Sequence, residues 1–168
     1  GAEDGTTIEG LRYAGLTPVE RERHERLPLY LYQPEDGAAS YAFPVSGPGL
    51  WGPIYGYLAL GEHAAVIRGL TFYRHSETPG LGGEISSASF LEQFRGKRIA
   101  EDGRLRPLEV VQAGVETRYP EGSEYAVDGI TGATRTSEYV ESLLNRSVRR
   151  YTVYFEQQGI WPDHGVDE

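Results

Sequence analysis

Cysteine and methionine are both missing from the 168 residues. Without cysteine the chain has no disulfide, no thiol nucleophile and no cysteine-ligated zinc or iron–sulfur centre. Methionine is missing even at the first position, so we expect an excised fragment of a longer chain, in which Gly1 and Ala2 are remnants of cloning. Any chemistry that this chain performs therefore does not use sulfur.

Long apolar runs and an excess of positive charge are also missing. No stretch approaches the ~20 consecutive apolar residues of a membrane-spanning helix. The net charge of −9 argues against a nucleic-acid-binding surface, which needs a basic patch. The length fits a single domain with a real core. No metal site is predicted, because no i, i+4 or similar pairing occurs among the histidines, which are His24, His63, His75 and His164.

The most informative stretch is Asp128–Ser137, which reads Asp-Gly-Ile-Thr-Gly-Ala-Thr-Arg-Thr-Ser. It predicts a hydroxyl-rich turn that opens a long amphipathic helix, and Gly159 would stop this helix after about Gln158. The first turn of a helix offers free N–H groups and the positive end of the dipole, which suit a phosphate. The alternative is a plain N-cap formed by serine or threonine. The apolar face of the helix would consist of Val140, Leu143, Leu144, Val148, Tyr151 and Phe155.

Aromatic and aliphatic segments upstream predict strands. Turn residues separate them into two hairpin-like pairs, and a short helix capped by Ser86 or Ser87 would run to about Phe94. The predicted fold class is α+β, with a mixed, largely antiparallel sheet packed against helices and a long C-terminal helix. The predicted strands cover residues 29–33, 40–45, 54–60, 64–73 and 108–112.

Two glycine-rich segments lie between these elements. Residues 47–52 match the dinucleotide-binding spacing G-x-G-x-x-G, but Pro48 and Pro53 break the required passage from strand to helix, so we reject a nicotinamide site. We expect instead a rigid loop with Trp51 packed on the sheet. Residues 75–84 predict a tight loop whose backbone N–H groups can approach a ligand, although a structural turn is the alternative.

Residues Asp128 to Thr136 resemble the flavinylation motif of FMN-binding domains. In that family the pattern is Asp, two residues, Ser or Thr, Gly-Ala-Thr, any residue and Thr. The last threonine carries FMN through a phosphoester bond. The resemblance therefore implies covalent FMN on Thr136.

Two further blocks, residues 46–60 and 69–84, stand in the order found in one branch of this family. With the motif, they resemble the C-subunit family of sodium-translocating NADH:quinone reductases over residues 28–160. The Glu-Thr-Pro-Gly-Leu-Gly run is shared with the related G-subunit family of Rnf complexes, whereas the first block favours the reductase. The chain departs from the family at Thr131, where serine is commoner, at Phe94, where tryptophan is commoner, and after Tyr151.

This resemblance implies a plan for the whole chain. Residues 1–27 would be a tether that follows a membrane-anchoring helix, residues 28–160 the FMN-binding domain, and residues 161–168 a tail. The domain would lie on the extracytoplasmic (periplasmic) side of the cell membrane. There it would relay electrons between other redox centres of the complex, after a separate flavin transferase has attached the FMN.

The resemblance also implies which residues surround the flavin. No catalytic residue and no metal ligand are implied, since the flavin performs the redox chemistry. Two alternatives stay open, namely an FMN-binding domain of an Rnf-type or other electron-transfer system and a noncatalytic ligand-binding module without flavin. The implied contacts beside Thr136 are Asp128, Gly132, Ala133, Thr134 and Ser137, while Glu77, Thr78, Leu81 and Gly82 would face the isoalloxazine ring.

Overall fold

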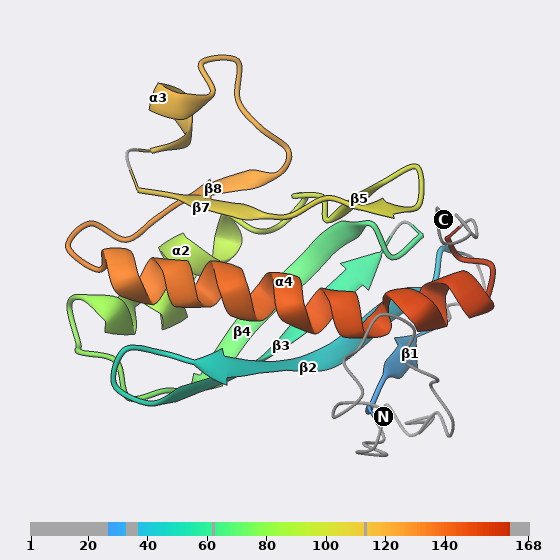
Figure 1. The fold of residues 1–168 in the computed structure, drawn as a ribbon, viewed down its shortest axis with the longest axis horizontal. Helices are drawn as coiled ribbons and strands as arrows, with labels where there is room; N and C mark the ends of the chain where they lie inside the picture. Colours follow the sequence, from blue (N-terminus) through green and yellow to red (C-terminus); the bar gives the residue numbers. More distant parts are fainter. Residues whose placement is uncertain (1–26, 33–36, 62, 113, 162–168) are drawn as a thin grey trace, which may run out of the picture.

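The central element is a four-stranded antiparallel sheet (Figure 1). The computed structural model describes residues 27–32, 37–61, 63–112 and 114–161. Each strand pairs with the next along the chain, so the two predicted hairpins are confirmed. In sheet order the strands are β1 (Tyr30–Tyr32), β2 (Ser40–Pro48), β3 (Pro53–Gly61) and β4 (Val66–Arg74).

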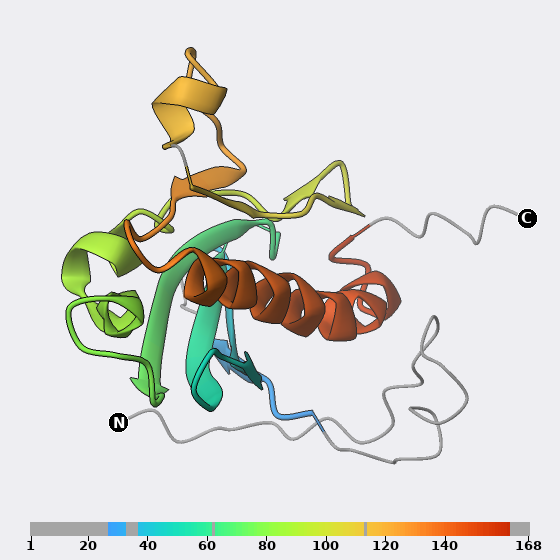
Figure 2. The same cartoon turned by 60° about the vertical axis from the view of Figure 1, so that its left-hand side comes forward.

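The long helix α4 (Thr134–Gln157) lies across one face of this sheet (Figures 1 and 2). All six residues of the predicted apolar face are buried. Tyr151 stacks on Phe43 of β2 with ring centroids 4.1 Å apart, and Phe155 meets Tyr41 edge-on at 5.4 Å. The predicted helix and its buried face are therefore confirmed, and their contact with β2 forms the centre of the core.

Short elements form a second layer beside α4. Their parallel β7–β8 pair and helix α3 were not predicted, while the strand predicted at 108–112 is present as β7. Ser87 caps α2, since its Oγ accepts the N–H of Phe90 at 3.3 Å. The elements are a 3₁₀ helix (Gly82–Ser86), α2 (Ala88–Glu92), β5 (Ala100–Glu101), β6 (Arg104–Leu105), β7 (Glu109–Val111), α3 (Val115–Arg118) and β8 (Ala126–Asp128).

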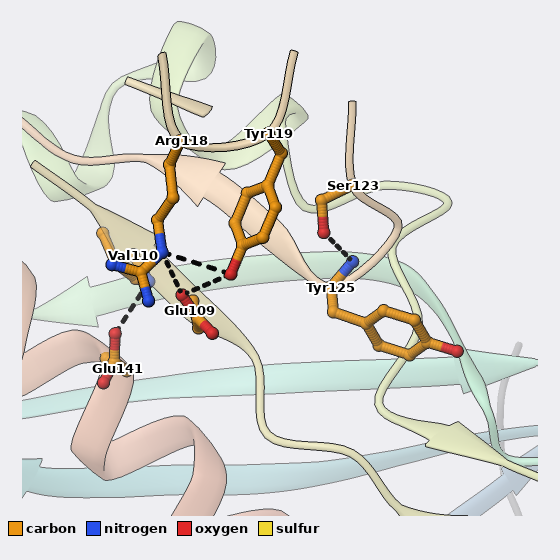
Figure 3. A network of polar contacts seen from close by, with 7 residues as sticks. All are labelled: Glu109, Val110, Arg118, Tyr119, Ser123, Tyr125 and Glu141. Carbon is orange, nitrogen blue, oxygen red and sulfur yellow. Dashed lines mark hydrogen bonds and ion pairs between the residues drawn. The ribbon is translucent and has the colours of Figure 1, made fainter. Parts of the chain in front are cut away.

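Polar side chains fasten this layer to α4 and hold α3 in place (Figure 3). Glu141 Oε2 of α4 accepts the N–H of Val110 at 2.8 Å. Glu109 of β7 accepts the hydroxyl of Tyr119 at 3.0 Å and pairs with Arg118 at 3.2 Å. The first of these bonds satisfies the backbone N–H of Val110 in β7, so the layer is positioned by specific hydrogen bonds as well as by apolar packing.

Two local predictions were wrong. Trp51 does not pack on the sheet, because its side chain lies at the β2–β3 turn and is 67% exposed. Trp161 does not begin a tail, because it is 2% exposed, packs on Phe155 and donates its Nε1–H to the carbonyl of His63 at 2.7 Å. Leu27 is also buried in the core. Packing thus reaches one residue beyond each predicted end of the domain, while the rest of the predicted tether and tail lies outside the described residues.

None of the helices in the described ranges is long and apolar enough to cross a membrane.

Candidate functional site

The motif threonine lies in the first turn of α4. The helix begins at Thr134, and Ala133 occupies the N-cap without a side-chain hydrogen bond, so the plain Ser/Thr N-cap is not formed. Ser137 is fully buried, and its Oγ accepts the N–H of Ile130 at 3.1 Å, which closes the turn before the helix. Thr136 is 1% exposed and is directed into the protein. The helix start is therefore shaped to place the Thr136 hydroxyl at an internal contact.

That contact is with Glu77. The Thr136 hydroxyl donates to Glu77 Oε2 at 2.6 Å, and both side chains are buried. The other carboxylate oxygen, Oε1, accepts the backbone N–H of Trp51 at 3.1 Å. A buried carboxylate is costly unless its oxygens are hydrogen-bonded, and these two bonds supply partners for both oxygens. The pair joins the 75–84 loop, the β2–β3 turn and α4 at one point.

A second set of bonds holds Glu77 from its own loop. The backbone N–H of Glu77 donates to Nδ1 of His75 at 3.2 Å. Nε2 of His75 lies 2.9 Å from Ser86 Oγ, which donates onward to the carbonyl of Phe72 at 3.2 Å. Nδ1 of His75 thus acts as an acceptor, while Nε2 faces a hydroxyl that donates to a backbone carbonyl. This relay ties the loop to the end of β4.

The loop covers the threonine with a glycine. A Cβ added to Gly82 would lie 2.5 Å from Thr136 Oγ1 and 2.9 Å from Glu77 Oε2, so a side chain has no room there. Leu81 is 45% exposed, and a Cβ added to Gly132 would lie 3.3 Å from its Cδ2. The structure thus brings the glycine-rich loop and the flavinylation motif together.

The other predicted site residues are less central. The carbonyl of Thr78 accepts the N–H groups of Leu81 and Gly83, which makes the loop a tight turn. Thr134 is exposed at the helix start, and Ala133 is buried before it. These residues lie near Thr136 in the chain or in the loop that covers it, but their contact with a flavin stays a prediction.

Asp128 has a structural role in this arrangement. Its Oδ1 accepts the N–H of Val115 at 2.6 Å at the start of α3, and its own N–H donates to Gln93 Oε1 at 2.9 Å. It also lines an open cleft of about 690 Å³ formed with residues 114–117 and 119–122, which does not include Thr136 or Glu77. Its predicted contact with a flavin is untested by these bonds.

Arg135, which precedes Thr136 in the chain, carries a positive charge at the start of α4. A hydrogen bond with Tyr139, aided by the carboxylate of Glu138, raises the pKa of the Arg135 guanidinium above its usual value. Arg135 therefore stays protonated at the helix start, 3.6 Å from Glu138, and its side chain is exposed. The free N–H groups of the first turn add to this field, which favours an anion outside the helix end.

Sequence reasoning missed several members of the site, namely Trp51, His75 and Ser86. Trp51 contributes its backbone N–H, and the side chains of Trp51 and Leu50 are both exposed. The proline and glycine residues around Trp51 signalled a tight turn, but no sequence pattern links that turn to Glu77. In the part of the chain that the structure describes, no three His, Asp or Glu side chains are grouped so that they could hold a metal ion.

The chain is similar to known proteins of one family. Residues 49–149 match the family described as FMN-binding domain. The C-subunit of the Na(+)-translocating NADH-quinone reductase of Vibrio alginolyticus is 36% identical over 135 residues, which are 77% of this chain and 51% of that protein. Its counterpart in Vibrio anguillarum is 39% identical over 113 residues, 67% of this chain and 43% of that one. The chain thus spans about half the length of the curated relatives that it matches.

Solved structures give the same result. The crystal structure of the same reductase component from Parabacteroides distasonis aligns with a TM-score of 0.70 at 33% identity and covers 90% of this chain and 73% of that one. The NqrC protein of Shewanella oneidensis aligns with a TM-score of 0.71 at 30% identity and covers 82% of this chain and 63% of that one.

Proposed function

The chain belongs to the FMN-binding domain family, and we propose that it carries one FMN as a phosphoester on Thr136. The observation that carries the proposal is the position of the Thr136 hydroxyl, in the first turn of a 24-residue helix and directly under the glycine-rich loop. A phosphate on this oxygen would lie at the end of α4 that carries the free backbone N–H groups and Arg135. The dipole would favour it by about 0.3–1 kcal/mol, so the covalent bond, rather than this attraction, retains the flavin.

Residues of the neighbouring loops can contact a flavin ring, while Gly82 has to move before a phosphate reaches Thr136 Oγ1. Exposed apolar side chains occur in the two loops that meet at Glu77, where Leu50, Trp51 and Leu81 are each at least 45% exposed. Such side chains can cover an aromatic ring system, while the glycine-rich loop offers backbone groups to its polar edge. We propose that Glu77, Thr78, Leu81 and Gly82 face the ring, with Leu81 on an apolar face. When bound, the flavin would supply the redox chemistry, and the chain would orient it and exclude water.

We further propose that this domain is a relay within a larger membrane reductase. The curated relatives named above are C-subunits of the Na(+)-translocating NADH-quinone reductase, which favours that complex over the Rnf type. The partners would be other subunits of the complex and a flavin transferase. The domain would hang from an N-terminal membrane anchor on the extracytoplasmic side. Residues 47–52 lie in the β2–β3 hairpin and not between a strand and a helix, so electrons would have to arrive from another subunit.

The test is modification of the purified protein by a flavin transferase supplied with FAD, followed by peptide mass spectrometry. We expect an FMN-sized adduct on Thr136 in the wild type and none in Thr136→Val. The matched control is Thr71→Val, which removes an exposed hydroxyl outside the motif and should leave the adduct in place. An adduct on Thr134 in the wild type, or full modification of Thr136→Val, would refute the assignment.

A further inference from the structure

We propose that the outer face of the four-stranded sheet is the surface on which an acidic segment of another reductase subunit docks. The inference rests on the proposed function, because it names where the partner of an electron relay would bind. We call this surface the tyrosine face. It consists of Tyr30 and Tyr32 of β1, Tyr55 and Tyr57 of β3, and Arg68, Tyr73 and Arg74 of β4.

Alternation along the strands creates this face. Successive side chains of a strand point to opposite sides of the sheet. In β3, Ile54 and Leu58 belong to the buried core that includes residues of α4, whereas Tyr57 points away and is 36% exposed. Tyr30 is 46% and Tyr73 60% exposed. The tyrosine face is therefore directed away from the core and from α4 (Figure 1).

The rings of the tyrosine face form a continuous row across the strands. Tyr30 meets Tyr57 edge-on with ring centroids 6.2 Å apart, and Tyr57 lies 5.6 Å from Tyr73. Tyr73 lies 6.4 Å from Tyr55, and the guanidinium carbon of Arg74 is 5.5 Å from the centroid of the Tyr55 ring. Rings that support one another are already ordered, so a partner that covers them immobilises few free side chains.

The charge of the tyrosine face is opposite to that of the whole chain. None of the four strands contains Asp, Glu or Lys, although the chain has 25 acidic residues and a net charge of −9. The charged residues of the strands are Arg68, whose side chain lies over Gly61, and Arg74. Neither arginine forms an ion pair with another described residue. The tyrosine face is thus complementary to a partner with negative charge.

The composition of the face favours a polypeptide as this partner. Tyrosine and arginine are enriched in protein interfaces, and Lys, Glu and Asp are depleted. A surface that binds lipid inserts Trp, Phe or Leu, but the outward positions between the tyrosines hold Ala42, Pro44 and Ala59. A second copy would set arginine against arginine with no acidic residue of the strands to pair with them. An acidic segment of another subunit fits better.

The tyrosine face ends at the loops that are proposed to contact the flavin. Arg74 is the last residue of β4 and directly precedes the 75–84 loop. Tyr55 follows the β2–β3 turn, in which the Trp51 N–H donates to Glu77 of the same loop. A subunit docked on the tyrosine face would therefore border the flavin, as an electron relay requires. This placement depends on the loop that faces the ring.

The experiment places photoreactive p-benzoylphenylalanine at position 57 of the full-length protein, assembled with its reductase in membranes. Illumination and peptide mass spectrometry should identify one peptide of another subunit that is rich in Asp and Glu. The same probe at position 73 should couple to the same segment, and it replaces the first probe if that variant does not fold. The matched control is the probe at position 146, where Arg146 is an exposed residue of α4, and it should not couple to this peptide.

Charge variants test the complementarity. Arg74→Glu should lower the yield of coupling from position 57 about tenfold, because it sets like charges against each other. Arg74→Lys keeps the charge and should retain most of the yield, and Arg146→Glu should retain all of it. Thermal unfolding and flavin absorbance verify that each variant is folded and carries its cofactor.

The outcomes separate the docking surface from the proposed function. Coupling of the position-57 probe to lipid, to a second copy or to nothing in an assembled reductase would overturn the inference while the flavin stands. Undiminished coupling in Arg74→Glu, or coupling of the position-146 probe to the same peptide, would also overturn it. A chain that couples as expected but carries no flavin would refute the proposed function and leave the docking surface in place.

Discussion

Replacing Gly82 with alanine is the sharpest steric test of the site. The added Cβ would lie 2.5 Å from Thr136 Oγ1, whereas ordinary contacts to a Cβ begin at 3.4 Å, so the shortfall is 3.4 − 2.5 = 0.9 Å. It would also lie 2.9 Å from Glu77 Oε2. A displacement of that size breaks a hydrogen bond of 2.6 Å. The loss of a charge-assisted bond and the overpacking each cost roughly 1–3 kcal/mol.

We expect Gly82→Ala to lower the free energy of unfolding by about 2–3 kcal/mol, which corresponds to a midpoint roughly 4–12 °C lower for a domain of this size. FMN attachment to Thr136 should fall as well, because the acceptor hydroxyl is displaced. Calorimetry of the unmodified protein and intact mass after incubation with transferase and FAD measure the two effects.

The matched control is Gly80→Ala in the same loop. Gly80 has φ +73° with nothing within 4 Å of an added Cβ, so alanine there meets backbone strain of about 1 kcal/mol and no steric contact. Its attachment rate should match the wild type. If Gly82→Ala unfolds at the wild-type midpoint and is fully modified, the close packing of loop and threonine described here is wrong.

Four further outcomes are expected. Trp161→Ala should lower the free energy of unfolding by about 3–5 kcal/mol, because it removes a buried aromatic side chain from the core. An unfolding titration measures this, and a change near zero would show that residue 161 belongs to the tail. Burial, with the nearby Tyr154, raises the pKa of Tyr41 above its ordinary value of 10.0. The unfolded chain therefore loses this proton first, and the free energy of unfolding should fall as pH rises above about 10. Tyr41→Phe should make this fall with pH less steep. Unmodified protein should be colourless and still unfold cooperatively, since sheet and helix pack without a ligand; a broad, non-cooperative melt would contradict this. Flavinylated protein should be bleached by dithionite but only negligibly by NADH; rapid bleaching by micromolar NADH alone would refute the relay.

The sequence was most informative where one periodic pattern covers a whole element. The apolar face of α4 repeats along the helix, and all of its predicted members are buried. The β1–β2 and β3–β4 hairpins were predictable because turn residues separate strongly apolar runs. By contrast, β5, β6 and β8 have two or three residues each, which is too short for alternation to be recognised.

The contacts within the site could not be derived from sequence. Thr136 and Glu77 are 59 residues apart, and no local pattern predicts that they share a hydrogen bond. Trp51 was misplaced for a related reason. A large aromatic residue next to a strand normally packs, but here the neighbouring glycines turn the chain so that its N–H, rather than its ring, faces inward. The same is true of Asp128. Its position in the motif did not indicate that its carboxylate would accept the N–H of Val115.

The rejected G-x-G-x-x-G spacing has a physical explanation in the finished structure. A Cβ on Gly47 would lie 2.7 Å from Leu143 Cβ, so the absence of a side chain lets α4 approach β2 closely. A Cβ on Gly49 would lie 2.7 Å from Glu77 Oε1. In a dinucleotide fold such glycines make room for a pyrophosphate, whereas here they make room for a helix and a carboxylate. The first contact sets how closely α4 approaches β2, and the second holds the Glu77 carboxylate against the β2–β3 hairpin. Together they determine where the Thr136 hydroxyl meets its partner, so substitutions in this hairpin should disturb flavin attachment without touching the motif itself.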